Sequence, residues 1–105
     1  MFVKVYRYHI PPAHIQRFLL LQQSADRIYR RYADYRVVFL QSQSEPGTWL
    51  EIHWYPDGAK HNQVMLQIQH EPEINQLWQE FQSLLDPAHR DIEEESFQQV
   101  LELGK

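Results

Sequence analysis

The pattern of apolar and polar positions along the 105-residue chain predicts an alternation of strands and helices. Four runs combine β-branched and aromatic residues with turn-forming residues at their ends, which is typical of β-strands. They span residues 3–10, 36–43 and 48–55, and the last falls within residues 92–103. The turn-forming segment Ser44–Gly47 separates the second run from the third, so these two strands are expected to form a hairpin.

Two other segments carry apolar residues at three- and four-residue spacing, which predicts amphipathic helices. The first follows Pro12 and ends near residues 32–34. The second covers residues 59–85, after an N-cap at Asp57. Pro72 lies inside it and is expected to break or kink the helix, because proline removes a backbone hydrogen bond and clashes with the preceding turn.

The order strand, helix, strand, strand, helix, strand predicts an α+β fold of the ferredoxin-like split βαβ type (βαββαβ). Right-handed crossovers place the first and third strands in the centre of a four-stranded antiparallel sheet, with both helices on one face. No linker or internal repeat interrupts the pattern. We therefore expect residues 1–105 to form a single domain.

The sheet face that the helices leave uncovered is expected to be an interface between two copies of the chain. Both parities of the central strands present bulky or charged side chains, and both are compatible with the sequence. A continuous surface of this kind usually marks an interaction site. The simplest arrangement is a two-fold homodimer in which the two sheets face each other and close a barrel, that is, a dimeric α+β barrel.

Composition narrows the classes of function. The chain has no cysteine, which excludes disulfides, thiolate metal sites and cysteine nucleophiles. A net charge of −4 without a clustered basic face argues against a nucleic-acid partner. No segment has the length of a membrane span and the N-terminus lacks the features of a signal peptide, so we expect a cytoplasmic protein with no membrane partner.

The histidines do not follow the spacing of a metal site. They lie at His9, His14, His53, His61, His70 and His89. They form no pair four residues apart and no HExxH sequence, and no carboxylate lies at ligand spacing on a shared helix face. We therefore expect no metal and no other cofactor.

A polar group in the two central strands admits two interpretations. Its members share one parity and are expected to lie on one sheet face: Arg7, His9, Glu51 and His53. In the first interpretation they form a polar cluster in the barrel lumen that orients an anionic or phenolic ligand. In the second, which we favour, they form partly buried ion pairs that set the register between subunits, because buried charge requires a partner.

A set of large side chains is placed to line a pocket between the sheet and the helices, which suits a planar organic ligand. The candidates are Tyr6, Tyr8, Trp54, Met65, Trp78 and Phe81. Plain core packing is the alternative, because aromatic residues at strand and helix spacing more often fill a core. His61 and Asn62, at the start of the second helix, are placed to bring polar groups to such a pocket, and His61 is the candidate catalytic residue.

The segments Arg7–Pro12 (RYHIPP) and Ile52–His61 (IHWYPDGAKH), each ahead of a helix, resemble the dimeric α+β barrel proteins typified by antibiotic-biosynthesis monooxygenase domains. The resemblance spans nearly the whole chain as an order of elements. It implies kinship with cofactor-independent oxygenases of polyphenolic substrates, haem-degrading enzymes, isomerases and members without known chemistry. Two positions depart from it: Ile52 stands where many members carry Glu, and Tyr6 lies about where the haem-degrading branch carries Asn.

Two hypotheses about function follow. The first is a cofactor-independent monooxygenase acting on a small hydrophobic or aromatic molecule, with His61 as proton acceptor and Tyr6, Trp54 and Trp78 as ligand walls. The alternative is a non-catalytic dimeric module that binds a small ligand or serves in a stress response. This alternative predicts that side chains fill the space between sheet and helices, leaving no cavity of a few hundred Å³.

Overall fold

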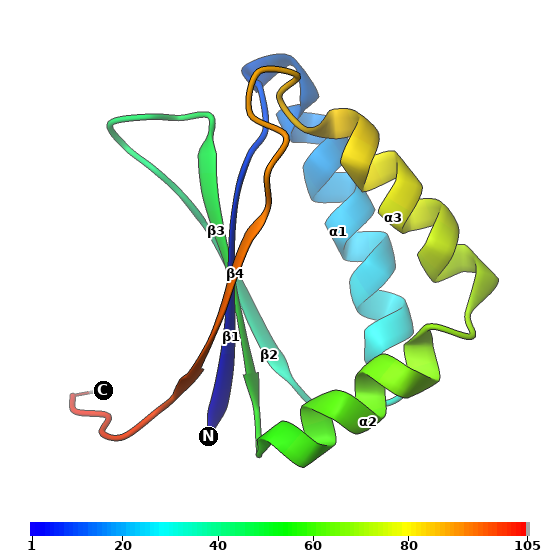
Figure 1. The fold of residues 1–105 in the computed structure, drawn as a ribbon, viewed down its shortest axis with the longest axis vertical. Coiled ribbons are helices and arrows are strands. Elements are labelled where there is room, and N and C mark those ends of the chain that lie inside the picture. Colours follow the sequence, from blue (N-terminus) through cyan, green and yellow to red (C-terminus); the bar gives the residue numbers. More distant parts are fainter. Residues whose placement is uncertain (105) are drawn as a thin grey trace.

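The structure is a computed structural model that describes residues 1–104. Its elements are β1 (Phe2–His9), a short 3₁₀ helix (Pro12–His14), α1 (Ile15–Tyr29), β2 (Arg36–Gln41), β3 (Thr48–Tyr55), α2 (Gly58–Ile68), α3 (Pro72–Leu84) and β4 (Glu93–Gln98). Four strands form one antiparallel sheet in the order β2-β3-β1-β4, with β1 and β3 in the centre as predicted. The three helices lie on one face of this sheet (Figure 1).

The helix boundaries follow from local chemistry. The predicted break at Pro72 is confirmed, because α2 ends at Ile68 and proline occupies the first turn of α3, where its missing N–H is not needed. Asp57 caps α2, and its Oδ1 accepts a hydrogen bond from the Lys60 backbone N–H at 2.7 Å. The first helix ends at Tyr29, slightly earlier than predicted, where the chain tightens into a turn.

Strand register decides which side chains face the helices. Tyr6 lies opposite Glu51, and the next pairs on this face are Lys4 with His53 and Tyr8 with Trp49. Paired residues of an antiparallel ladder point to the same side of the sheet. Each pair joins an even-numbered residue of β1 to an odd-numbered residue of β3. The even-numbered residues of β1 and the odd-numbered residues of β3 therefore face the helices.

This register corrects one expectation from the sequence, that Arg7, His9, Glu51 and His53 share one face. Arg7 lies opposite Leu50, and both point to the open face. His9 lies opposite Thr48 on that same face, whereas Glu51 and His53 point towards the helices. The prediction was wrong because it assumed that equal parity in two strands means one face, which the register of the ladder does not require.

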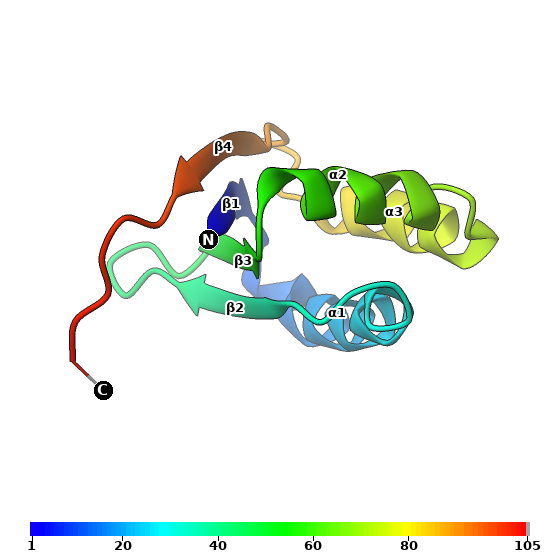
Figure 2. The ribbon, with the colours of Figure 1, turned by 90° about the horizontal axis from the view of Figure 1, so that it is seen from below.

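Two clusters of buried side chains hold the helices on the sheet. One joins the strand ends near Tyr8 and Trp49 to Phe18 of α1 and Phe81 of α3. The other joins Tyr35, Tyr55, Val64 and Ile68 at the opposite end. The view from below shows α1 alongside β2, and α2 and α3 on the side of β1 and β4 (Figure 2).

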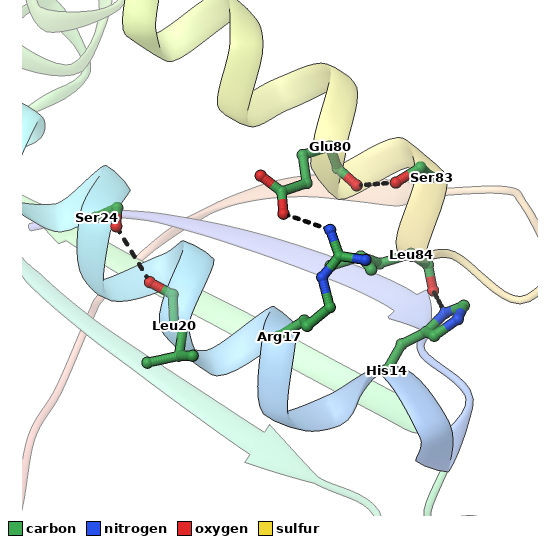
Figure 3. A network of polar contacts seen from close by, with 7 residues as sticks. All are labelled: His14, Arg17, Leu20, Ser24, Glu80, Ser83 and Leu84. Carbon is green, nitrogen blue, oxygen red and sulfur yellow. Dashed lines mark hydrogen bonds and ion pairs between the residues drawn. The ribbon is translucent and has the colours of Figure 1, made fainter.

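Polar contacts fix α1 against α3 at one end of this layer (Figure 3). The Arg17 guanidinium donates from Nη2 to Glu80 Oε1 at 2.7 Å. Just before α1, at the end of the 3₁₀ helix, His14 Nδ1 lies 3.0 Å from the carbonyl oxygen of Leu84, so this nitrogen carries a proton and donates the hydrogen bond. The two helices therefore meet through both polar and apolar contacts.

Candidate functional site

A cavity of about 600 Å³ lies between the sheet and the helices. The sheet contributes Tyr6, Tyr8, Glu51, His53, Tyr55 and Glu94 to its wall. The helices contribute the polar side chain of His61 and mainly apolar side chains, among them Ala25, Tyr29, Met65, Ile68, Leu77, Trp78 and Phe81. A cavity of this size with an aromatic wall and a few polar groups has the features of a small-molecule site.

Three side chains from the central strands form a hydrogen-bonded row on the cavity wall. The Tyr8 hydroxyl donates to Glu51 Oε1 at 2.7 Å. The other carboxylate oxygen, Oε2, lies 2.5 Å from His53 Nε2, which donates because a carboxylate only accepts. The side chains of Glu51 and His53 are 15% and 9% exposed, so the pair is largely shielded from water. In the neutral ring of His53 this arrangement leaves the lone pair on Nδ1.

The His53 ring is fixed by aromatic neighbours as well as by the carboxylate. It stacks on Tyr35 with ring centroids 5.7 Å apart, and it lies nearly parallel to Tyr55 at 6.2 Å. The edge of the Tyr6 ring approaches it at 5.6 Å. A histidine paired with a carboxylate and fixed in orientation is a common proton-accepting unit, because the carboxylate stabilises the imidazolium that forms.

The tyrosines of the cavity are hydrogen-bond donors rather than anions. Burial raises the pKa of Tyr29 to about 12, and the nearby Glu51 carboxylate adds to the rise. Burial raises the pKa of Tyr6 and Tyr8 further, again with Glu51 as a contributing charge. The pKa of Tyr55 is also raised, chiefly by burial. These hydroxyls therefore stay protonated in the neutral pH range.

His61 lies in the first turn of α2 and lines the cavity. Its ring packs between Phe2 and Tyr55, with centroids 5.0 Å from each. Nδ1 lies 3.3 Å from Asn62 Oδ1, an acceptor, so Nδ1 carries the proton and Nε2 the lone pair. Burial lowers the pKa of His61, and the charge of Lys4 lowers it further, which keeps the ring neutral near pH 7.

Most of the predicted pocket residues line the cavity. These are Tyr6, Tyr8, Met65, Trp78 and Phe81. Of the five, Tyr8 and Phe81 also belong to the buried core, which was the alternative interpretation for them. Trp78 is half exposed and stacks on Phe81, with ring centroids 5.6 Å apart.

Two predicted pocket residues lie elsewhere. Trp54 is paired with Val3 and Arg36 on the open face of the sheet, and the Arg36 guanidinium lies 4.6 Å from its ring centre. It occupies an even position of β3, whereas the odd positions face the helices. Asn62 is exposed and reaches the site only through its hydrogen bond to His61.

Several residues that line the cavity were not predicted from the sequence as pocket residues. Tyr55 is two positions after His53 and so shares its face, and Tyr29 continues the apolar stripe of α1 one turn after Ala25. Glu94 lies in the acidic run Glu93–Glu95 of β4, and its pairing with Tyr6 turns it to the helix side. The periodicity of the strand or helix predicts the position of all three residues, once it is known which positions of that element face the cavity.

The remaining predicted polar residues lie outside the cavity. Arg7 is exposed on the open face. The His9 ring contacts Thr48 Oγ1 at 3.2 Å and lies 4.9 Å from the ring of His89. Within residues 1–104, no three histidine or acidic side chains come together as a group able to hold a metal ion. No helix in the same range is both long enough and apolar enough to cross a bilayer.

Comparisons with known proteins find matches among solved structures but none among family models or curated sequences. No protein-family model matches the sequence, and no curated protein matches it. Solved structures do match over almost the whole chain. An uncharacterized NIPSNAP domain protein from Burkholderia xenovorans is 16% identical, with a TM-score of 0.78 and complete coverage of both chains.

Two further matches carry names that bear on chemistry. SnoaB, a cofactor-independent oxygenase from Streptomyces nogalater, is 14% identical with a TM-score of 0.73, and the match covers 99% of this chain and 97% of that one. A protein described as an antibiotic biosynthesis monooxygenase is 17% identical with a TM-score of 0.71, covering 96% of this chain and all of the other. The resemblance drawn from the sequence is thus confirmed at the level of the fold: this chain has the ferredoxin-like α+β fold of antibiotic biosynthesis monooxygenase-like proteins.

Proposed function

We propose that the protein is a cofactor-independent monooxygenase that oxidises a small phenolic aromatic molecule. The observation that carries this proposal is the Glu51–His53 pair on the wall of an aromatic cavity of about 600 Å³. The cavity also counts against the alternative of a filled, inactive module, which predicts no such space. The similarity in fold to SnoaB, a cofactor-independent oxygenase, agrees with the proposal.

The proposed proton acceptor is Nδ1 of His53, with Glu51 stabilising the imidazolium. His61 was the acceptor expected from the sequence, but its hydrogen-bond partner is the Asn62 amide oxygen rather than a carboxylate, and burial weakens it as a base by lowering its pKa. In this proposal His61 binds the substrate through Nε2. The protonated hydroxyls of Tyr6 and Tyr55 add hydrogen-bond donors to the cavity wall.

The reaction balances without a cofactor when molecular oxygen is the oxidant. His53 takes the phenolic proton, and the electron-rich phenolate reduces O₂ and forms a C–O bond at the ring carbon opposite the oxygen. The O–O bond then breaks as that carbon loses its hydrogen, which leaves a quinone. One oxygen atom remains in the quinone. The other leaves as water, which carries the proton that His53 returns and the hydrogen lost from the ring carbon as a proton.

Oxygen consumption with 1-naphthol tests the function. The expected products are 1,4-naphthoquinone and water, with one ¹⁸O atom from labelled O₂ in the quinone. His53→Gln is expected to lower kcat by about 10²-fold or more, the usual contribution of a general base, while His61→Gln lowers it less than tenfold. If 1-naphthol and related naphthols and anthrones bind but no oxygen is consumed, the protein is a binding module.

We also propose that the open face of the sheet packs against a second copy of the chain. Apolar side chains with the register of this face run across all four strands: Val3, Val5, Val38, Leu40, Leu50, Ile52, Trp54 and Phe97. Leu40 and Phe97 are each 46% exposed. Large apolar side chains gathered on one open sheet face are typical of a surface that a partner covers.

The sheet face alone is smaller than a stable dimer interface, so a second part of the chain is expected to contribute to the contact. Four strands about 4.8 Å apart and about seven residues long at about 3.3 Å per residue present roughly 440 Å². A stable interface buries about 800 Å² per partner. The segment after β4 offers further apolar area, because Val100, Leu101 and Leu103 are 89%, 72% and 81% exposed. Sedimentation at micromolar concentration is expected to give twice the 12.8 kDa chain mass, and a 12.8 kDa particle would overturn the proposal.

A further inference from the structure

We propose that the cavity selects aromatic ligands without an anionic substituent, and that Glu94 at its β4 edge is the residue that enforces this selection. The inference rests on the proposed function only in taking the cavity as the ligand site. It concerns which ligands enter, and it can hold whether or not they react with oxygen.

The charged side chains of the cavity wall are acidic. Among the residues that line it, the carboxylates are Glu51 and Glu94, and no lysine or arginine takes part. Tyr6 lies opposite Glu51 in the β1–β3 ladder and opposite Glu94 in the β1–β4 ladder. The two carboxylates therefore flank Tyr6 in one row on the helix-facing side, about 10 Å apart at their backbones from two strand spacings.

The two carboxylates differ in how free they are to meet a ligand. Both oxygens of Glu51 are engaged, by Tyr8 and His53, so this group sets the potential of the cavity without being available to bind. The Glu94 side chain is 54% exposed. It lines the cavity from β4, an edge strand of the sheet, in a position opposite Tyr6.

Lys4 is the basic group nearest to this row, and it does not reverse the sign of the wall. Its Nζ lies 3.7 Å from Glu94 Oε2 and donates to Ser96 Oγ at 3.1 Å, towards the sheet end away from Glu51. Lys4 does not line the cavity. The Lys4 side chain is only 14% exposed and its charge lowers the pKa of His61, so it offsets part of the acidic charge. Two carboxylates, Glu51 and Glu94, face this one cation, and the wall keeps a net negative charge. His61 is neutral near pH 7 and contributes no positive charge.

The aromatic wall strengthens the same preference. Tyr6, Tyr29, Tyr55 and Trp78 offer ring faces and edges around the space. Aromatic faces attract cations and repel anions through the ring quadrupole. A carboxylate on the ligand therefore loses water without gaining a free cationic partner, because Lys4 is already engaged by Glu94 and Ser96. An ammonium group instead gains both ring faces and Glu94. The expected order of affinity is cationic or neutral ligands above anionic ones.

A matched ligand series tests this order in oxygen-free buffer, where binding is measured without turnover. The probes are 2-naphthol derivatives with hydroxymethyl, carboxylate or aminomethyl at carbon 6, titrated calorimetrically. The carboxylate is expected to bind at least tenfold more weakly than the hydroxymethyl compound, and the aminomethyl compound at least as tightly. The carboxylate penalty should shrink in high salt, because screening weakens interactions with a half-exposed charge.

Glu94→Gln is expected to reduce the carboxylate penalty at least threefold and to change affinity for the hydroxymethyl compound less than twofold. The control is Glu93→Gln, which removes the same charge from the neighbouring position, whose register with Arg7 turns it to the open face. Equal binding of the three probes, equal effects of the two variants, or no binding at all would overturn the inference. If the probes bind in the expected order of charge but the protein consumes no oxygen with 1-naphthol, the monooxygenase proposal is refuted and the inference about charge selection still holds.

Discussion

The hydrogen bond from Tyr8 to Glu51 connects the core to the proposed base, and Tyr8→Phe tests it. The substitution removes only the hydroxyl. The ring remains packed edge-on against Phe18 and Phe81, at centroid distances of 5.8 Å and 4.9 Å, so no cavity opens. The change in stability therefore reports the 2.7 Å contact with the Glu51 carboxylate.

Hydrogen bonds to charged groups contribute about 1.5–3 kcal/mol to stability. An unfolding entropy of about 2.1 cal/mol/K per residue makes 1 kcal/mol equal to about 4.5 °C in Tm for a chain of 105 residues. Tyr8→Phe is thus expected to lower Tm by about 7–14 °C. In a Glu51→Gln background the acceptor is neutral, and the same substitution should cost only about 0.5–1.5 kcal/mol.

Urea unfolding of the unchanged chain, the two single variants and the double variant, at one protein concentration, measures the free-energy cost of Tyr8→Phe in each background. Tyr6→Phe is the matched control, because its hydroxyl lines the same cavity and makes no side-chain hydrogen bond within residues 1–104. It should change stability by less than about 0.5 kcal/mol. Equal costs of Tyr8→Phe in the two backgrounds, or a cost no larger than that of Tyr6→Phe, would refute the hydrogen-bonded row.

Other changes test separate parts of the structure. Asp57→Ala removes the cap of α2 and should cost about 0.5–2 kcal/mol in urea unfolding, with Asp57→Asn as the control that keeps an acceptor. The pKa of His61 is lowered in the folded chain, so below about pH 6.5 the unfolded chain binds more protons, and stability falls as pH falls towards the lowered value. His61→Gln should therefore flatten unfolding free energy against pH between about pH 7 and pH 5, and an unchanged slope would contradict this origin. Leu40→Glu places a charge on the open face and should shift sedimentation towards the monomer, while Leu66→Glu, an exposed position on α2, should leave it unchanged.

The sequence predicted the fold well because each element is locally consistent. The β-branched and aromatic runs end at Pro11 and Pro56, and the spacing of apolar residues changes from two to about 3.6 in between. Pro72 marked the break between α2 and α3 correctly. These signals are local, so they survive without knowledge of the three-dimensional contacts.

The site was harder to predict because it depends on register, which is not local. Glu51 and His53 were recognised as a polar group, but parity alone joined them to Arg7 and His9 instead of to Tyr8. Strands one and three carry polar and apolar residues on both faces, so no hydrophobic alternation showed which side was inward. Trp54 was misplaced for the same reason.

The central claim is that the cavity beside Glu51 and His53 holds an aromatic ligand, and a crystal structure of the 1-naphthol complex tests it most directly. The account predicts the ring between Tyr6, Tyr55 and Trp78, with the naphthol oxygen within hydrogen-bond distance of His53 Nδ1. Naphthol bound on the open face of the sheet, or a cavity closed by its own side chains with no ligand inside, would contradict it.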